Sequence, residues 1–456
     1  MSNLAKYNSF RETYPEFVYE SYLYDVQSDG LHIVFTFRIG DYVFNPTAFI
    51  PSRRFLHFES VGDLTDLLVF NIGMIELVSY WKSFCPRRVM VACGCLSEDQ
   101  IGFWRRVFYY GLGEFFYING IDAKLDDFME IVCRKEGVRP GPFAFAPARG
   151  RDFLVPIGGG KDSVVTLELL SGRNGDGFST VPLIMNPRGA TINCIKAAGY
   201  DLDDALVIER TIDPLLLRLN GEGCLNGHTP FSAMLAFYSL LAAQLSGIPN
   251  VALSNEWSAN EATVAGSTVN HQYSKSKGFE DDFRKYTGTF LSPGLNYFSF
   301  LRPLSELQIA MLFSRYPKYF DVFRSCNAGS KEDVWCGRCA KCLFAYIILS
   351  PFIPPSRLRS IFGHDLLDDP ALEFFFDELV GRGDKKPFEC VGTVDEVKTA
   401  LSMALERWYG SARPRLLRRF VPCAHRVSLS RVEAEHNVPP DLFNILLEHV
   451  QAAVVG

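Results

Sequence analysis

The sequence lacks an excess of basic residues, a leading apolar segment and any repeated or low-complexity tract. Lysine and arginine number 46 against 52 aspartates and glutamates, which leaves a net charge of −6. A large nucleic-acid-binding surface is usually marked by a basic balance, so this composition argues against nucleic acid as a partner. Residues 1–6 lead directly into polar sequence, so we expect no secretory signal.

The sequence also lacks a clear membrane span. Its longest uncharged run, residues 231–248, is of borderline length and contains Ser232, Ser239 and Gln244. We therefore expect a buried helix of a soluble, cytoplasmic protein. The 12 cysteines, with no secretory signal, indicate reduced thiols and a metal site rather than disulfides.

We expect three regions along the 456 residues. Residues 1–150 are predicted to form an α+β domain suited to substrate binding, and residues 351–456 a mainly helical region. Within the first region we predict the following segments: strands at 31–37 and 41–44, helices at 73–81 and 122–133, and a linker or long loop at 136–151.

The region from 151 to 350 alternates between short apolar runs and helical patterns. The predicted strands are 153–157, 181–185, 205–208 and 251–253, and the predicted helices include 164–170, 191–198 and one beginning near Pro230. Such alternation is typical of an α/β fold with a doubly wound, mostly parallel sheet covered by helices on both faces.

A glycine-rich turn lies between the first of these strands and its helix, Gly158-Gly159-Gly160-Lys161-Asp162-Ser163. Glycines let the backbone approach a phosphate closely, and the following helix adds its N-terminal dipole. Lys161 offers a positive charge, Ser163 a hydroxyl, and Asp162 a group that can orient the loop or hold Mg²⁺. The turn therefore predicts binding of ATP phosphates, although a tight turn without ligand remains the alternative.

The spacing of the residues in this turn does not match two other phosphate-binding motifs. A Walker A loop needs glycine five residues before Gly160 and Ser or Thr after Lys161, where Val155 and Asp162 stand. A dinucleotide fingerprint needs glycine in place of Ser163. The turn instead resembles the Ser-Gly-Gly-x-Asp-Ser loop of the PP-loop ATP pyrophosphatases, with Gly158 in place of the first serine. The resemblance covers residues 150–345 and implies cleavage of ATP to AMP and pyrophosphate.

Polar clusters follow the predicted strands. Asn186-Pro187-Arg188-Gly189 follows the second strand, Ser254-Asn255-Glu256 the fourth, and Asn226-Gly227-His228-Thr229-Pro230 opens the long helix. Ligands of doubly wound sheets bind beyond the carboxyl ends of the strands, so we expect Arg188, Asn255 and Glu256 to contribute to nucleotide binding. Capped turns are the alternative. His271, Tyr273 and Ser274, in a polar stretch without apolar period, are predicted to contact substrate.

Four cysteines have the spacing of a metal site. Cys326 precedes Cys336, Cys339 and Cys342, and short Cys-x-x-Cys knuckles suit a tetrahedral Zn²⁺ site. An iron–sulfur cluster is the second possibility, although a ferredoxin pattern would require a cysteine at position 346, which is occupied by Tyr346. We predict a structural zinc before a helix at 343–349. The stretch resembles the zinc loop of PP-loop enzymes that make 7-cyano-7-deazaguanine.

Taken as a whole, the chain resembles the bacterial UDP-N-acetyl-muramoyl-L-alanyl-L-glutamate epimerases. The resemblance runs through six groups of residues: 70–76 with 80–82, 111–117, the glycine-rich turn at 158–163, Ser254-Asn255-Glu256, Asn270-His271-Gln272-Tyr273 and Phe388-Glu389-Cys390-Val391-Gly392. It implies epimerisation, dependent on ATP and Mg²⁺, of the terminal L-Glu of a peptidoglycan precursor to D-Glu. Adenylation would remove the charge of the carboxylate and make the adjacent C–H more acidic.

The groups that move the proton remain open between several side chains. Cys390 lies before a predicted helix starting near Thr393, where a helix N-terminus can lower a thiol pKa; a buried packing cysteine is the alternative. His228, His271 and Lys275 are its rivals. Two other functions stay open: a ligase or amidotransferase that modifies a nucleobase or tRNA, and a zinc-stabilised binding protein regulated by nucleotide.

Overall fold

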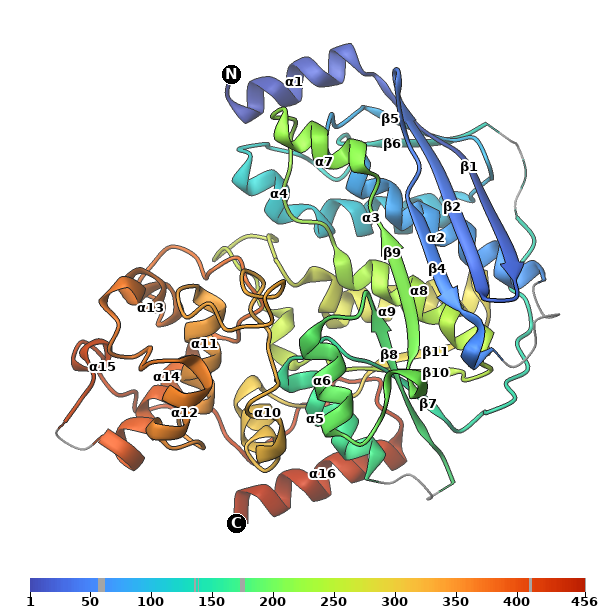
Figure 1. Ribbon diagram of the computed structural model, residues 1–456. Helices are drawn as coiled ribbons and strands as arrows, with labels where there is room; N and C mark the ends of the chain where they lie inside the picture. Colours follow the sequence, from blue (N-terminus) through green and yellow to red (C-terminus); the bar gives the residue numbers. More distant parts are fainter. Residues whose placement is uncertain (56–61, 135–136, 138, 173–176, 410–411, 456) are drawn as a thin grey trace. The chain divides into compact units, whose positions relative to one another are not determined.

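The computed structural model describes residues 1–55, 62–134, 137, 139–172, 177–409 and 412–455. Figure 1 shows the course of the chain. The chain forms two compact units, each built from several stretches of sequence. Unit 1 comprises Met1–Leu154, Leu206–Val251 and Thr268–Tyr297, and unit 2 comprises Val155–Ala205, Ala252–Ser267 and Phe298–Gly456.

Unit 1 contains a mixed sheet. Its strands follow the order β6-β5-β1-β2-β4-β9, with β3 on β2. Their bounds are β1 Glu16–Gln27, β2 Gly30–Ile39, β3 Tyr42–Phe44, β4 Thr47–Pro51, β5 Arg88–Val91, β6 Glu130–Cys133 and β9 Leu206–Thr211. Pairing is antiparallel from β1 through β2 and β4 to β9, and parallel from β1 through β5 to β6.

In the described part of unit 1 the sheet is accompanied by seven α-helices: α1 Asn3–Thr13, α2 Asp63–Trp81, α3 Glu98–Gly111, α4 Gly113–Ile118, α7 Pro214–Gly221, α8 Phe231–Ser246 and α9 Lys277–Tyr286. The core of unit 1 lies around α2, which packs against α8. Among the described residues α2 is the one helix long and apolar enough to cross a membrane, but 94% of its apolar window is buried. A core helix passes the same test, so this finding is weak evidence for a span.

Three strands run from one unit into the other along the chain: β7 Phe153–Pro156, β10 Asn250–Leu253 and β11 Asn296–Ser299. β7 and β10 are parallel, with Asn250 opposite Phe153. In unit 2, Ile157 continues beyond β7 and donates from its backbone N–H to Leu183 O of β8 (Thr180–Met185) at 2.8 Å. The end of β7 is thus paired with β8 within unit 2, and the glycine-rich turn follows it directly.

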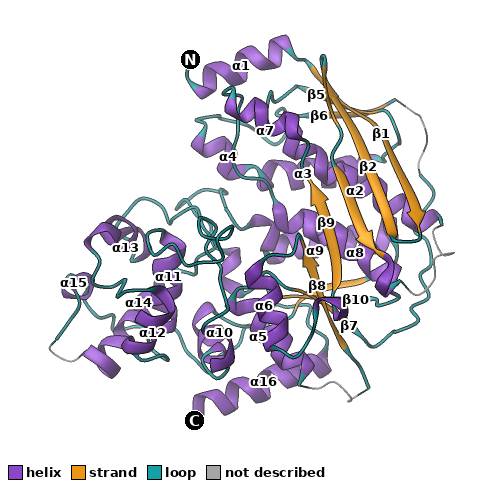
Figure 2. Ribbon diagram, viewed as in Figure 1, coloured by secondary structure: helices purple, strands orange, loops and turns teal. Residues whose placement is uncertain are grey.

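Helices are the main regular structure of unit 2, and beyond Ser299 the described residues contain no β-strand (Figure 2). The α-helices are α5 Lys161–Ser171, α6 Gly189–Ala197, α10 Glu306–Phe313, α11 Ala340–Leu349, α12 Pro355–Phe362, α13 Glu373–Leu379, α14 Val394–Ala404, α15 Arg415–Arg418 and α16 Pro440–Val455.

Most predicted elements are confirmed. The hairpin at 31–37 and 41–44 is β2 with β3, joined by Gly40 at φ +55°, a left-handed conformation that favours glycine. The helix predicted from Pro230 is α8, the helix at 343–349 is part of α11, and the helix expected near Thr393 is α14 with Thr393 as its N-cap. The described part of 136–151 is free of helix and strand, as expected.

Two predictions about the fold are wrong. The α/β class is confirmed, but the sheet is partly antiparallel rather than mostly parallel. The strand predicted at 205–208 is β9, which runs antiparallel to β4, with Thr47 opposite Thr211. The helix predicted at 122–133 is instead a turn followed by β6. There the pairing of Ile131 with Val89 of β5 outweighs the local helical spacing.

Candidate active site

The glycine-rich turn joins β7 to α5 in unit 2, as the sequence predicted. Gly160 is the N-cap of α5, and the Ser163 hydroxyl donates to Gly160 O at 3.0 Å. Gly159 has φ +82°, and a Cβ there would lie 2.9 Å from Ala190 Cβ, so this position requires glycine. At Gly158 an added Cβ would meet nothing within 4 Å. The missing serine of the PP-loop pattern therefore corresponds to open space.

Lys161 is buried beside two carboxyl groups. Its Nζ donates to Asp162 Oδ1 at 2.5 Å and to Glu306 Oε2. Burial opposes a charge on Lys161, but the carboxylates of Asp162 and Glu306 outweigh burial and raise the lysine pKa. Burial, opposed by Lys161, raises the pKa of Glu306 to about 8, and the negative charges of Asp162 and Glu256 add to this rise. Lys161 thus keeps its charge within an acidic cluster.

Glu306 is a site residue that the sequence analysis missed. It is the first residue of α10 and is 1% exposed. Its own backbone N–H donates to Glu396 Oε1 at 2.6 Å. Ser305 and Gln308 form a capping box that marks this helix start in the sequence. That local signal predicts the helix but not the pairing of Glu306 with Lys161, 145 positions away in the chain.

The turn that carries Cys390 lies against Glu306. A Cβ at Gly392 would lie 2.7 Å from Glu396 Oε2 and 3.2 Å from Glu306 Cγ. Thr393 N donates to Glu396 Oε2 at 2.6 Å, which fixes the turn at the start of α14. The half-buried Cys390 accepts, through its backbone oxygen, a hydrogen bond from Lys341. The structure therefore places the Cys390 turn next to the acidic partner of Lys161.

The segment from 324 to 333 borders the other side of the glycine turn. Arg324 N donates to Gly159 O at 2.8 Å, and a Cβ at Gly160 would lie 3.3 Å from Ser325 Cβ. Arg188, which is exposed, donates to Ser330 Oγ at 2.7 Å. The polar residues after β8 and the segment 324–333 therefore meet beside the turn.

Asn255 and Glu256 follow β10 and are buried in unit 2. Asn255 Nδ2 donates to Ser299 Oγ at 3.0 Å, and Arg302 donates to the backbone oxygen of Glu256 at 2.5 Å. The influence of Glu256 on the Glu306 pKa places its charge in the same acidic neighbourhood. Both residues predicted from the strand end thus lie in the unit that holds the glycine turn.

The four predicted metal cysteines come together. Their Sγ atoms lie within 4.8 Å of one another, with separations of 3.7 Å for Cys326–Cys339 and Cys336–Cys342 and 3.5 Å for Cys339–Cys342. A Zn²⁺ ion with bonds of about 2.3 Å needs tetrahedral edges of about 3.8 Å. Hydrogen bonding from Cys342 lowers the pKa of Cys339 to about 5. The set fits a tetrahedral thiolate site.

The remaining predicted residues lie in unit 1, where His228 and His271 are neighbours. Their ring centroids are 4.5 Å apart. His271 Nδ1 is hydrogen-bonded to Glu114 Oε2, and His228 Nδ1 lies 3.5 Å from the same oxygen. Burial, and then the positive charges of His271, Lys82 and Lys275, lower the pKa of His228 to about 3. His228 is therefore a neutral imidazole at neutral pH.

Tyr273, Ser274 and Lys275 form a short 3-10 turn after His271. The Tyr273 ring packs 5.2 Å from Tyr110, and burial raises the pKa of its hydroxyl. Ser274 is buried. The structure brings Lys275 near His228 and adds Glu114 and Lys82, whose roles the sequence patterns did not indicate.

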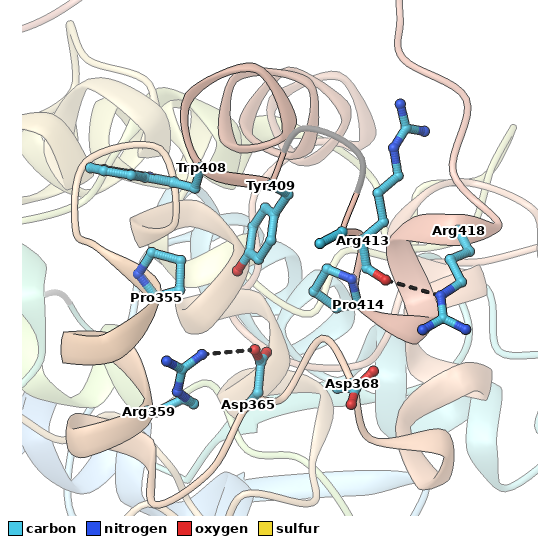
Figure 3. Close-up of a pocket in the computed structure, with 10 residues that line it drawn as sticks. Pro355, Arg359, Asp365, Asp368, Trp408, Tyr409, Arg413, Pro414 and Arg418 are labelled. Carbon is cyan, nitrogen blue, oxygen red and sulfur yellow. Dashed lines mark hydrogen bonds and ion pairs between the residues drawn. The ribbon is translucent and has the colours of Figure 1, made fainter.

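A separate hollow lies among the C-terminal helices of unit 2. It has a volume of about 600 Å³ and contains none of the predicted site residues (Figure 3). Trp408 and Tyr409 line it together with several arginines. Asp365 lies 3.6 Å from Arg359, and Arg418 donates to Arg413 O at 2.9 Å (Figure 3). Some of the charged side chains that line the hollow thus already have partners within the protein.

Comparison with known proteins identifies the family. A family described as the MurL N-terminal domain matches residues 8–300, and one described as the MurL C-terminal domain matches residues 322–429. No solved structure matches the chain.

Three curated relatives carry the name UDP-N-acetyl-alpha-D-muramoyl-L-alanyl-L-glutamate epimerase. The protein of Xanthomonas oryzae pv. oryzae is 33% identical over 440 residues, 92% of this chain and 94% of the relative. That of Salinispora tropica is 38% identical over 354 residues, 76% and 74% of the two chains. That of a Micromonospora species is 35% identical over 399 residues, 84% and 85%. The matched domains and this near full-length similarity show that the chain belongs to the MurL family.

Proposed function

We propose that this protein is an epimerase that converts the terminal L-Glu of UDP-MurNAc-L-Ala-L-Glu to D-Glu at the expense of ATP. The observation that carries the proposal is the similarity to relatives named for this epimerisation, which extends over 92% of the chain in one case. The MurL N-terminal match includes the glycine turn, and the C-terminal match includes both Cys390 and the cysteine cluster.

ATP is proposed to bind at the glycine turn in the manner of a PP-loop. Three features of the turn support this. Space is open beside Gly158, the backbone N–H groups at the start of α5 suit an anion, and Lys161 carries a charge. Lys161 would then contact phosphate oxygens and stabilise the departing pyrophosphate.

Mg²⁺ is proposed to bind in the same place. Asp162, Glu256 and Glu306 supply more carboxyl groups than Lys161 alone compensates, and oxygen donors are the ligands that Mg²⁺ prefers. Lys341 is a second nearby cation, and it donates a hydrogen bond to the backbone oxygen of Cys390. A divalent ion bridging protein carboxylates and phosphate would relieve the raised pKa of Glu306.

Activation of the carboxylate explains why an epimerase would consume ATP. The proton next to an ionised carboxylate is hard to remove, because the carbanion would carry additional negative charge. Transfer of AMP to the carboxylate cancels that charge, releases pyrophosphate and leaves an electron-withdrawing acyl-adenylate. A base can then remove the α-proton, an acid can return a proton to the other face, and water releases AMP.

Cys390, His228 and Lys275 are the proposed proton carriers. Cys390 is supported by its place in the turn against Glu306, the partner of Lys161. His228 is supported by its neutral imidazole, which can accept a proton. The cysteine cluster is proposed to hold a structural Zn²⁺ that anchors the segment bordering the glycine turn.

The test is incubation of the protein with UDP-MurNAc-L-Ala-L-Glu and Mg-ATP in deuterated water. Epimerisation predicts AMP, pyrophosphate and deuterium at the glutamate α-carbon. Lys161→Met should abolish all three, whereas Lys196→Met, at an exposed lysine in the last turn of α6 in the same unit, should change none. Absence of deuterium from the wild-type product would refute the epimerase. Release of AMP with a nucleobase substrate instead would favour a PP-loop ligase.

A further inference from the structure

The neighbourhood of Glu114 in unit 1 has the donor geometry of a metal site. One oxygen of Glu114 and one nitrogen each of His228 and His271 lie within 4.8 Å of one another. Both histidines direct Nδ1 at the same oxygen, Glu114 Oε2. Two imidazole nitrogens that converge on one carboxylate oxygen form the kind of donor set that binds transition metals.

We propose that Glu114, His228 and His271 bind a divalent transition metal ion, at a second metal site separate from the cysteine cluster. The proposal stands on the geometry of unit 1 and does not depend on the epimerase activity. An ion bound at His228 Nδ1 would occupy the lone pair that accepts a proton, so metal binding and the proton-carrier role proposed for His228 are alternatives.

Packing holds Glu114 and His228 in place. Glu114 lies in the first turn of α4, and the neighbouring Phe115 contacts Gly227, where an added Cβ would lie 3.2 Å from its ring. Lys82 donates to Gly227 O and, at 2.7 Å, to Thr229 Oγ1, so hydrogen bonds fix the chain on both sides of His228. The two ligands are therefore positioned before any ion binds.

His271 is held by a tight turn and by aromatic packing. Gln272 N donates to Asn270 Oδ1 at 2.8 Å, and Tyr273 N donates to Asn270 O at 3.1 Å. Tyr273 then packs on Tyr110. Three segments far apart in sequence thus present rigidly held ligands to one point, as an ion of fixed coordination geometry requires.

The donor types select the class of ion. Two imidazole nitrogens and one carboxylate oxygen suit Zn²⁺, Fe²⁺, Co²⁺ or Mn²⁺, whereas Mg²⁺ prefers a shell of oxygens. Four thiolates, as in the cysteine cluster, are a softer set. The side chains of His228, His271 and Glu114 are 20%, 11% and 13% exposed, so each of the three side chains keeps some contact with solvent. Three protein ligands with open positions are the arrangement of catalytic rather than structural metal sites.

Nearby charges indicate what completes the shell. Lys82 and Lys275 both act electrostatically on His228, so a dication here also faces positive charge. Lys82 directs its hydrogen bonds at the 227–229 turn instead of at Glu114. An anionic oxygen, from hydroxide, a carboxylate or a phosphate, would balance the remaining charge at the open positions.

Cobalt loading of the purified full-length chain tests the proposal. After removal of metal by a chelator, the protein is dialysed against Co²⁺, and bound metal and the absorption spectrum are measured. Replacement of one metal ligand should remove one site, so His228→Gln and His271→Gln should each bind about one equivalent less than wild type. His32→Gln is the matched control, because His32 also contacts a carboxylate, Asp29 at 3.0 Å, in unit 1.

The spectrum distinguishes the two sites. Co²⁺ at thiolates gives intense sulfur-to-metal charge-transfer bands, so those bands should persist in His228→Gln and disappear in Cys336→Ser. Cobalt that remains in Cys336→Ser should show only a nitrogen and oxygen environment by X-ray absorption. This last measurement needs no histidine variant and so stands even if His228→Gln folds poorly.

Unchanged cobalt content in both histidine variants, or cobalt with only sulfur neighbours in wild type, would overturn the proposal. Glu114 and His271 would then be a hydrogen-bonded proton-transfer pair without metal. Neither result would bear on the epimerase assay, because the measurement is metal content.

Discussion

Glu306 Oε2 accepts a hydrogen bond from Lys161 Nζ, and both side chains are almost fully buried. The bond joins the first residue of α5 to the first residue of α10. Lys161 is therefore held at the glycine turn by an acidic partner. A phosphate group that binds Lys161 would compete with Glu306 for the same ammonium group.

The Lys161–Glu306 pair predicts that substitutions at these two positions have coupled effects on the free energy of unfolding. Loss of Lys161 leaves Glu306 buried without its cation, which typically costs about 3–5 kcal/mol, whereas after loss of Glu306 the lysine keeps Asp162 as a partner. We expect Lys161→Met to lower the free energy of unfolding by an amount of this order and Glu306→Gln to lower it by less. The double variant should lose clearly less than both effects combined. Denaturant unfolding of the four proteins measures the coupling, and strictly additive losses would mean that the two side chains do not interact.

The geometry of the glycine turn predicts that alanine substitutions at two neighbouring positions differ in their effect on stability. Gly159→Ala should destabilise the protein by about 1–3 kcal/mol, because φ is +82° and Ala190 is too close for a side chain. Gly158→Ala should cost little, because a Cβ there meets open space. Thermal unfolding of the two variants provides a matched comparison. Equal destabilisation would show that the backbone of the turn differs from the one described.

Gly158→Ser separates binding from folding at the same turn. The serine restores the usual PP-loop residue without a clash, so stability should stay near that of wild type. If the turn binds phosphate, the added hydroxyl faces the ligand and should change the affinity for Mg-ATP, which calorimetry can measure. An affinity identical to wild type would indicate that the open space beside Gly158 is not occupied by nucleotide.

Local patterns in the sequence predicted this turn and the cysteine cluster well. Each depends on residues close in the chain: a strand, three glycines and a helix in one case, and two short cysteine spacings in the other. The approach of Cys326 to Cys339 can be predicted for the same reason, since only 13 positions separate the two residues. Such features need little knowledge of the tertiary fold.

Pairings across long stretches of chain could not be predicted in this way. Glu114 meets His271 over 157 positions, and no property of either segment identifies the other. The direction of β9 is set by its partner β4, and strand β6 forms because β5 offers a free edge. In each case a tertiary partner decides the outcome, and one sequence without its fold does not name that partner.

Zinc at the cysteine cluster predicts loss of metal and of stability together. Cys339→Ser removes a ligand that lies within 3.7 Å of two other sulfurs, so zinc content should fall by about one equivalent. The protein should also unfold at a lower denaturant concentration, because metal binding contributes directly to folding free energy. Cys224→Ser, at a half-buried cysteine outside the cluster, should keep its zinc. Equal zinc in both variants would exclude the cluster as its site.

Lys82 predicts a pH dependence of stability in unit 1. Burial, followed by the charge of Arg210, lowers the pKa of Lys82 from 10.5 to about 8. Between these two values the unfolded chain binds a proton that the folded chain does not, so the contribution of Lys82 to stability rises with pH. Below pH 8 both states are protonated and the destabilisation is constant. The difference between the two pKa values corresponds to at most about 3.4 kcal/mol of stability.

Replacement of this lysine by methionine should therefore have an effect that depends on pH. Lys82→Met removes the buried charge but also the hydrogen bonds to Gly227 O and Thr229 Oγ1, which offsets part of the gain. Relative to wild type, the variant should be most stable at or below pH 8 and should lose about 2–3 kcal/mol of that relative stability by pH 10.5. Other groups titrate alike in both proteins, so the difference between their unfolding free energies isolates Lys82. A difference that stays constant from pH 7.5 to pH 10.5 would mean that the pKa of Lys82 is not lowered.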